Sequence, residues 1–159
     1  MDFSKLTLGD KILGGCALVL VIDLLFLPWH HWSYSYSSGD IHVGGSFSRT
    51  AIQSPNSFWG WLAMLVLLAI IGVTIVRRFT DTALPDTPRP LPELTFYATI
   101  AVFVLLFLKL ILKFDYIGFG AYLAILLAGG MVYGAYLDRN EEEGAPSVGT
   151  GDGGTATPF

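Results

Sequence analysis

Charged residues are scarce in this chain, and cysteine is almost absent. Only 14% of the 159 residues are charged, whereas soluble domains average about 25%. The single cysteine, Cys16, excludes a disulfide within the chain. The net charge is −4, and the Lys and Arg residues form no basic footprint of the kind that binds nucleic acid. These shortages exclude an internal disulfide and argue against a nucleic-acid partner.

Catalytic and cofactor-binding signatures are missing as well. No Gly-rich phosphate loop follows a strand-like segment, and the serines lack a convincing base and orienting group. Paired carboxylates occur only near the C-terminus. We therefore expect neither enzymatic activity nor a bound cofactor.

What the chain has in abundance is hydrophobic sequence. Hydrophobic residues make up 53% of it, and they gather in four runs that are each long enough to cross a bilayer as a helix. The runs predict helices over about 11–29, 57–77, 93–113 and 116–137. We expect an all-α membrane fold, a four-transmembrane-helix bundle over residues 1–138. The polar segment 139–159 is expected to be a disordered cytoplasmic tail.

The first run also has the basic start of a secretory signal peptide. It ends in Leu27-Pro28-Trp29-His30 rather than in small residues, which favours an uncleaved helix. Between the second and third runs, Pro85, Pro88, Pro90 and Pro92 predict an extended inner loop. This loop is either a stiff connector or a docking peptide for a cytoplasmic partner.

Basic residues and tryptophans predict the orientation. With both termini inside, the inner segments hold most of the basic residues: Lys5, Lys11, Arg77, Arg78, Arg89 and Arg139. The outer loops hold Arg49 and Lys113. Aromatic residues mark the outer boundary, where Trp59, Trp61 and Tyr116 are expected to form a belt at the level of the lipid headgroups. We expect a protein integral to a plasma membrane, of bacterial inner-membrane type, with its N- and C-termini inside.

The fourth run is rich in small residues, which let helices approach closely in membranes. The residues concerned are Gly120, Ala124, Ala128, Gly130 and Gly134. This face is expected to pack within the bundle; the alternative is a contact with another subunit of a homo-oligomer.

The outer loop, residues 30–56, is the one stretch with strand-like alternation. Aromatic and serine residues alternate from Trp32 to Ser37, and Ser38-Gly39-Asp40 and Gly44-Gly45 are turn signals. We predict a three-stranded antiparallel β-meander whose apolar face rests on the helix ends or on a partner. The expected interaction surface contains Trp29, His30, His31, Trp32, Tyr34, Tyr36 and Phe47.

This topology resembles that of claudins and other tetraspan proteins, which also carry a strand-bearing loop between the first two spans. The loop has none of the paired cysteines of claudins, so the resemblance does not extend to tight-junction function. Part of the sequence is similar to uncharacterised small four-transmembrane proteins of actinobacterial type. The similar segments are LFLPWHHWSYSYSSGDIHVGGSFSRTA and, after it, FWGWLAMLVLLAIIGV. That similarity covers roughly residues 6–136 and implies no activity.

Two charges interrupt the apolar runs. Asp23 lies six residues before Trp29, and Lys109 lies five residues before Phe114, so both are expected at a similar depth. We hypothesise that they pair and hold two helices together. The alternatives are that Lys109 reaches outward to the headgroups, or that both residues serve proton or ion transport.

Three histidines lie in the outer loop. His30, His31 and His42, with Asp40, are candidates for a metal site or for sensing external acidity, but no ligand spacing supports either role. We expect them to serve the packing of the loop instead, with no bound metal. The functional expectation is a non-catalytic accessory or scaffold protein that contacts lipid and other membrane or envelope proteins. The alternative is a small transporter or channel component that uses Asp23 and Lys109.

Overall fold

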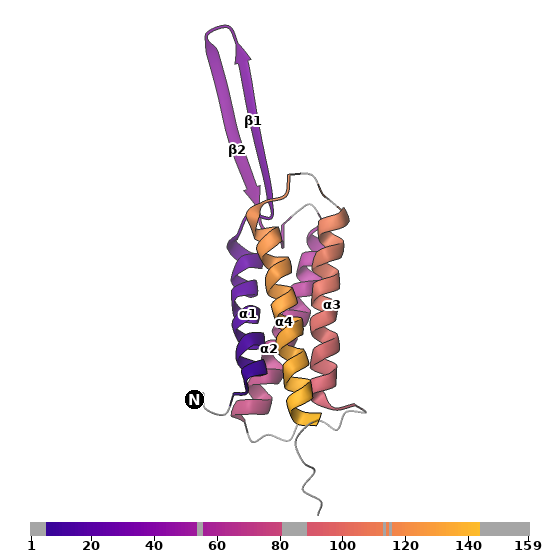
Figure 1. Cartoon of the computed structure of the whole chain (residues 1–159). Helices are drawn as coiled ribbons and strands as arrows, with labels where there is room; N and C mark the ends of the chain where they lie inside the picture. The colour runs from indigo at the N-terminus through magenta and orange to yellow at the C-terminus, as the bar shows by residue number, and fades with distance from the viewer. Residues whose placement is uncertain (1–5, 54–55, 81–88, 113, 115, 144–159) are drawn as a thin grey trace, which may run out of the picture.

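The computed structural model describes residues 6–53, 56–80, 89–112, 114 and 116–143, without the side chains of residues 142 and 143. These residues form α1 (Leu8–Phe26), β1 (His30–Ser38), β2 (Ile41–Arg49), α2 (Ser57–Phe79), α3 (Leu91–Leu112) and α4 (Phe119–Glu143). Figure 1 shows the four helices side by side in an upright bundle, with the hairpin of β1 and β2 projecting from one end.

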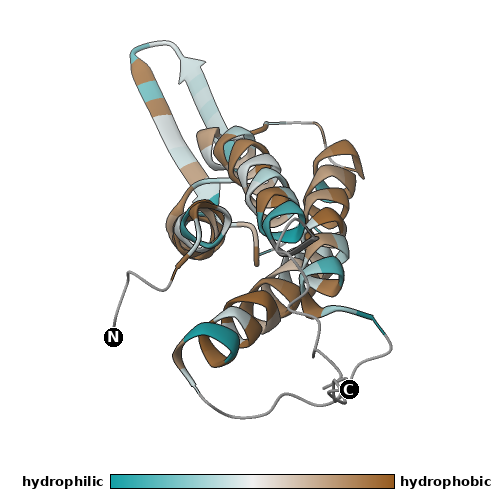
Figure 2. Cartoon of the chain, turned by 60° about the horizontal axis from the view of Figure 1, so that its bottom comes forward, coloured by the Kyte–Doolittle hydropathy of each residue, from teal (hydrophilic) through white to brown (hydrophobic). Residues whose placement is uncertain are grey.

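Three of the helices, α2, α3 and α4, are long and apolar enough to cross a membrane. Hydrophobic residues dominate their ribbons in Figure 2, and hydrophilic colours are concentrated toward the helix ends. The mostly helical fold that we predicted is therefore present, and this composition suggests a membrane protein.

The first helix lies closer to the N-terminus than the predicted range 11–29. Its start is set by a capping box: the Thr7 hydroxyl accepts a hydrogen bond from the Asp10 amide, and the Asp10 carboxylate accepts one from the Thr7 amide, each at 3.1 Å. Its end is set by Pro28, because the residue before a proline disfavours the helical region. Leu27 is accordingly extended, with φ −81° and ψ 147°.

The fourth helix begins and ends later than predicted. Tyr116 has a left-handed backbone with φ 59°, so the helix starts at Phe119 rather than at residue 116. It continues past residue 137 to Glu143, which moves the start of the expected tail. Glutamates are good helix formers, and Asp138 is held by arginines of α2, which anchors the last turns. The rest of the tail, 144–159, and residues 81–88 of the proline-rich loop lie outside the described residues.

Most of the small residues of α4 are buried in the bundle, and Gly130 and Gly134 lie where that helix meets α1. Ala124 and Ala128 are fully buried, and a Cβ added at Gly130 would lie 2.8 Å from Cys16 Sγ. At Gly134 an added Cβ would lie 2.7 Å from the backbone nitrogen of Leu13. The two helix backbones therefore approach closely, as small residues allow in membrane bundles.

The predicted three-stranded meander is wrong, because the outer loop forms a two-stranded hairpin. Nine antiparallel pairs join β1 to β2, from His30–Arg49 to Ser38–Ile41. Only the Ser38-Gly39-Asp40 signal turns the chain, with Gly39 at φ 59°, as a tight hairpin requires. Gly44 and Gly45 continue the ladder opposite Ser35 and Tyr34 instead of turning.

The hairpin does not lay its apolar face on the helix ends. Figure 1 shows that it stands clear of the bundle beyond its root. Nine residues at about 3.3 Å each give a projection of roughly 30 Å. Because the ladder runs unbroken to Gly39, nothing bends the strands back toward the helices, and the outer apolar side chains stay exposed.

Candidate functional site

The hairpin carries a continuous strip of large apolar side chains on one face. Cross-strand partners share a face, and the pairs Trp32–Phe47, Tyr34–Gly45 and Tyr36–Val43 alternate with pairs of Ser, Gly and His. We call the exposed members of this face the apolar strip: Tyr34, Tyr36, Ile41, Val43 and Phe47. Each of them is more than half exposed, from 51% at Val43 to 66% at Tyr36.

The inner part of the apolar strip is ordered by its own contacts. The rings of Tyr34 and Phe47 stack with centroids 6.2 Å apart and planes 21° apart. Tyr34 also lies over Gly45, where an added Cβ would come within 2.7 Å of the tyrosine hydroxyl oxygen. The glycine therefore leaves room for the ring, and Tyr34 is held flat along the strip.

The root of the hairpin is tied to the connection between α3 and α4. The amide of His31 donates to the Tyr116 carbonyl at 2.9 Å, and the amide of Gly118 donates to the Trp29 carbonyl at 2.8 Å. His30 also forms a β-bridge with Ile117. Residues 116–118 thus make a short strand-like contact with the root of the hairpin.

Aromatic stacking extends this attachment. His30 stacks on Trp32 with ring centroids 5.7 Å apart, and Trp32 lies 6.2 Å from Tyr116. His30 is 3% exposed, so it belongs to the root rather than to the accessible surface. The predicted interaction surface is therefore divided: Trp29 and His30 are buried, while Tyr34, Tyr36 and Phe47 are exposed.

Below the root, the two charges that interrupt the apolar runs, Asp23 and Lys109, contact the same tryptophan. Trp29 is 1% exposed, and its indole Nε1 donates a 3.0 Å hydrogen bond to Oδ2 of Asp23. Lys109 Nζ lies 5.8 Å from the centre of the Trp29 ring and donates a 3.0 Å hydrogen bond to the Asn56 carbonyl. These two contacts tie the amine of Lys109 to the indole of Trp29 and to the residue before α2.

Asp23 and Lys109 thus lie on the same residue, Trp29, and each is 1% exposed. Among the residues that the structure describes, however, the two groups form no direct ion pair; Trp29 connects them. The Asn56 carbonyl precedes α2, so this cluster joins α1, the start of α2, and α3 beneath the hairpin. Sequence spacing pointed to the two charges but gave no sign that an indole would link them.

The histidines lie at opposite ends of the hairpin. His30 pairs with Arg49 at the root, whereas His42 pairs with Ser37 next to the turn and its Nδ1 lies 2.9 Å from the serine hydroxyl. Seven residues of strand separate the two positions, about 23 Å. Within the described part of the chain, no group of three His, Cys, Asp or Glu side chains is arranged to hold a metal ion.

The expected aromatic belt lies around the hairpin end of the bundle. Trp61 is 52% and Tyr116 60% exposed, while Trp59 is half-buried and packs edge-on against Phe58 at 5.4 Å. Tyr116 also has a role outside the belt, since its ring contacts Trp32 at the hairpin root. The belt residues therefore lie at the end of the bundle from which the hairpin projects.

A charge cluster at the other end of the bundle was not predicted. Arg78 reaches both Asp10 and Asp138 at 2.7 Å, and Arg77 reaches Asp138 at 2.9 Å. Both carboxylates are buried, and Thr7 adds a 3.4 Å contact from its hydroxyl to Asp138. The cluster joins α1, α2 and α4. The Thr7-x-x-Asp10 pattern signalled the cap, but the cross-helix partners depend on packing.

Comparison of the chain with protein-family models, with curated proteins and with solved structures finds no match.

Proposed function

We propose that this chain is a non-catalytic four-span membrane protein that presents the β-hairpin outside the plasma membrane, with both termini inside. In this proposal the hairpin binds another membrane or envelope protein, or a second copy of the chain, and the helices hold it at a defined height. The protein then acts as an accessory or scaffold subunit.

The proposal requires α1 to be a fourth span. Its 19 residues extend about 28 Å at 1.5 Å per residue, close to the hydrocarbon thickness. Two of its carboxylates have partners that reduce the cost of burying them: Asp10 pairs with Arg78, and Asp23 accepts from Trp29. Figure 1 shows α1 alongside α4 over its length, which supports a shared membrane location.

The orientation is supported by the two ends of the bundle. Arg77 and Arg78 lie at the end away from the hairpin, where basic residues favour the cytoplasm. Trp61 and Tyr116 lie at the hairpin end, where exposed aromatic side chains suit the headgroup region.

The observation that carries the proposed function is the exposed apolar strip. An isolated two-stranded hairpin is marginally stable in water, and exposed apolar patches mark interaction sites. Between His31 and Ser48 the strands contain no Lys, Arg or Pro, the residues that usually protect strand edges from pairing. Binding to a partner would both cover the apolar strip and stabilise the hairpin.

The test is photo-crosslinking in native membranes from single positions on the two faces. A photoreactive phenylalanine at Tyr36 should give a discrete crosslinked product, and the same residue at Ser35, which points to the opposite face, should not. Adding Ile41→Ser should weaken the Tyr36 product. Equal products from both faces, or none from Tyr36, would overturn the proposal.

One observation favours a transport component as the second candidate. Oδ1 of Asp23 is buried and accepts no hydrogen bond within the described residues, and a buried carboxylate in a span is a candidate for carrying protons or ions. Reconstituted vesicles decide between the candidates. A flux of protons or ions that Asp23→Asn abolishes would support transport. If the wild-type protein shows no such flux, the transport candidate is excluded.

A further inference from the structure

We propose that the groove between α1 and α2 binds an acyl chain of an anionic phospholipid, whose headgroup is bound by Lys11 at the inner membrane surface. This inference rests on α1 lying in the membrane, as the proposed function requires. It does not depend on what the hairpin binds.

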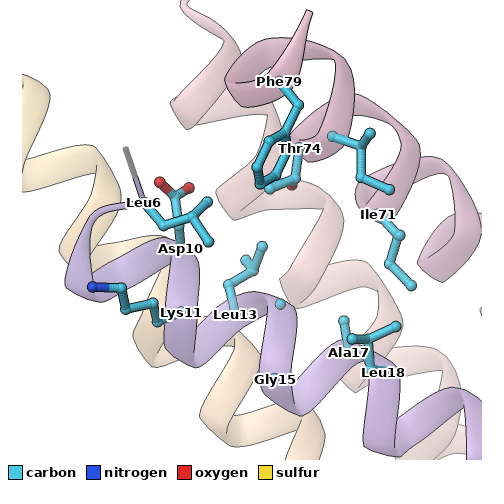
Figure 3. Close-up of a pocket in the computed structure, with 12 residues that line it drawn as sticks. Leu6, Asp10, Lys11, Leu13, Gly15, Ala17, Leu18, Ile71, Thr74 and Phe79 are labelled. Carbon is cyan, nitrogen blue, oxygen red and sulfur yellow. The ribbon is translucent and has the colours of Figure 1, made fainter. Parts of the chain in front are cut away.

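The groove is an apolar cavity of about 330 Å³ at the end of the bundle away from the hairpin. Figure 3 shows side chains of α1 and α2 facing it from two sides. Its walls include Leu13, Ala17 and Leu18 of α1 and Ile71, Ile75 and Phe79 of α2. Such walls suit a hydrocarbon chain and provide almost no hydrogen-bonding partner for a polar ligand.

Two adjacent glycines leave the α1 side of the groove open. A Cβ added at Gly14 or at Gly15 would meet no atom within 4 Å, in contrast to the crowded glycines where α1 meets α4. Empty apolar space loses dispersion contacts on one side, so close packing favours filling the groove. In a bilayer the material at hand is a lipid tail.

Lys11 of α1 lies at the inner end of the groove. Lys11 is exposed, and among the described residues no carboxylate lies within ion-pair distance of its amine. The neighbouring carboxylate, Asp10, is already neutralised by Arg78 at 2.7 Å. The hydroxyl of Thr74 donates to the Ile70 carbonyl at 2.9 Å, so its donor does not need a hydrogen bond from a ligand.

The groove therefore has hydrocarbon walls, and at its inner end it is lined by Lys11 and by Asp10, whose charge Arg78 offsets. This polarity matches a phosphate-bearing headgroup with its tail in the groove. Anionic lipids are enriched in the cytoplasmic leaflet, where basic residues near the surface attract them. A transmembrane helix of a second copy would match the apolar walls but would leave the Lys11 charge without a counterpart.

The experiment measures the association of spin-labelled phosphatidylglycerol and phosphatidylcholine with the full-length protein in vesicles. We expect about a fivefold preference for phosphatidylglycerol, the effect of one basic residue near the surface. Lys11→Gln should remove this preference, and Gly15→Leu should reduce the bound fraction of both lipids by filling the groove.

Two matched controls separate the groove from general effects. Arg89→Gln removes another basic residue expected on the inner side, and Gly129→Leu enlarges a glycine of α4 that is equally open, with no atom within 4 Å of an added Cβ. Neither should change lipid selectivity. A preference that survives Lys11→Gln, or lipid binding unaffected by Gly15→Leu, would overturn the inference.

A second copy in the groove is tested by disulfide crosslinking of Gly15→Cys in a Cys16→Ala background. Crosslinked dimers would assign the groove to a protein contact and overturn the lipid site. If the lipid site is overturned in this way, the proposed function still stands as long as the crosslinks from the hairpin are observed. Labelling that places both ends of α1 on one side of the membrane would overturn both.

Discussion

The indole of Trp29 donates a 3.0 Å hydrogen bond to the buried carboxylate of Asp23, and Trp29 is also the residue from which the hairpin leaves the bundle. Its amide donates to the carbonyl of Arg49, the last residue of β2, at 2.8 Å. One residue therefore joins the helical core to both strands. The orientation of the hairpin depends on this joint.

Replacing Trp29 by Phe should destabilise the protein. The ring is partly kept beside Lys109, but Asp23 loses its hydrogen-bond donor while it remains buried. An unsatisfied buried acceptor costs about 1–3 kcal/mol. Thermal unfolding in detergent measures the loss. Trp61→Phe, at a half-exposed position of the same end, should change the stability by less than about 0.5 kcal/mol.

Removing the charge of Asp138 should loosen the end of the bundle that lies away from the hairpin. Asp138→Asn leaves Arg77 and Arg78 with a neutral amide in place of a shared carboxylate. Breaking a buried ion pair costs about 3–5 kcal/mol, and the partial exposure of both arginines favours the lower end. Glu93→Gln disrupts the more exposed pair with Arg89 and should cost about 0.5 kcal/mol or less. Equal effects of the two variants on the unfolding midpoint would contradict this assignment.

Enlarging Gly134 should separate α1 from α4. A side chain there would start 2.7 Å from the Leu13 backbone nitrogen and 2.9 Å from the Gly9 carbonyl oxygen, and backbone atoms cannot yield without moving a helix. We expect Gly134→Leu to lower the yield of folded monodisperse protein severalfold in size-exclusion chromatography. Gly129→Leu, on the same helix but facing open space, should be tolerated. The assignment fails if the two variants behave alike.

Cysteine labelling should establish the topology. In a Cys16→Ala background, a membrane-impermeant maleimide should label Ser35→Cys in intact cells, because the proposed topology places the hairpin outside. Leu8→Cys and Thr80→Cys, both exposed at the opposite end of the bundle, should react only after permeabilisation. Labelling of Leu8→Cys in intact cells would show that α1 does not span the membrane.

The helices were predictable because their cause is local. A run such as 58–76 carries no charge over nineteen residues, and hydrocarbon permits an exposed segment of that kind only as a helix. The errors lie at the ends, where short polar signals compete with hydrophobicity. The Thr7–Asp10 box and Pro28 moved α1, and the Asp138 contacts helped α4 to continue. The hairpin error has the same character: Gly44-Gly45 suits a turn or a ladder, and pairing with β1 decided it.

By itself, the sequence determined that the chain is built from long apolar helices, that one loop alternates like a strand, and that Asp23 and Lys109 lie at one depth. Hydrophobicity and periodicity are properties of neighbouring residues, so they can be read along the chain. Only the tertiary structure decided that Trp29 links those two charges, that Asp10, Arg78 and Asp138 meet across three helices, and that the apolar strip stays uncovered. Such contacts join residues far apart along the chain: Thr7 and Asp138, in the same charge cluster, are 131 positions apart. Such contacts depend on how the helices pack, which no local pattern specifies.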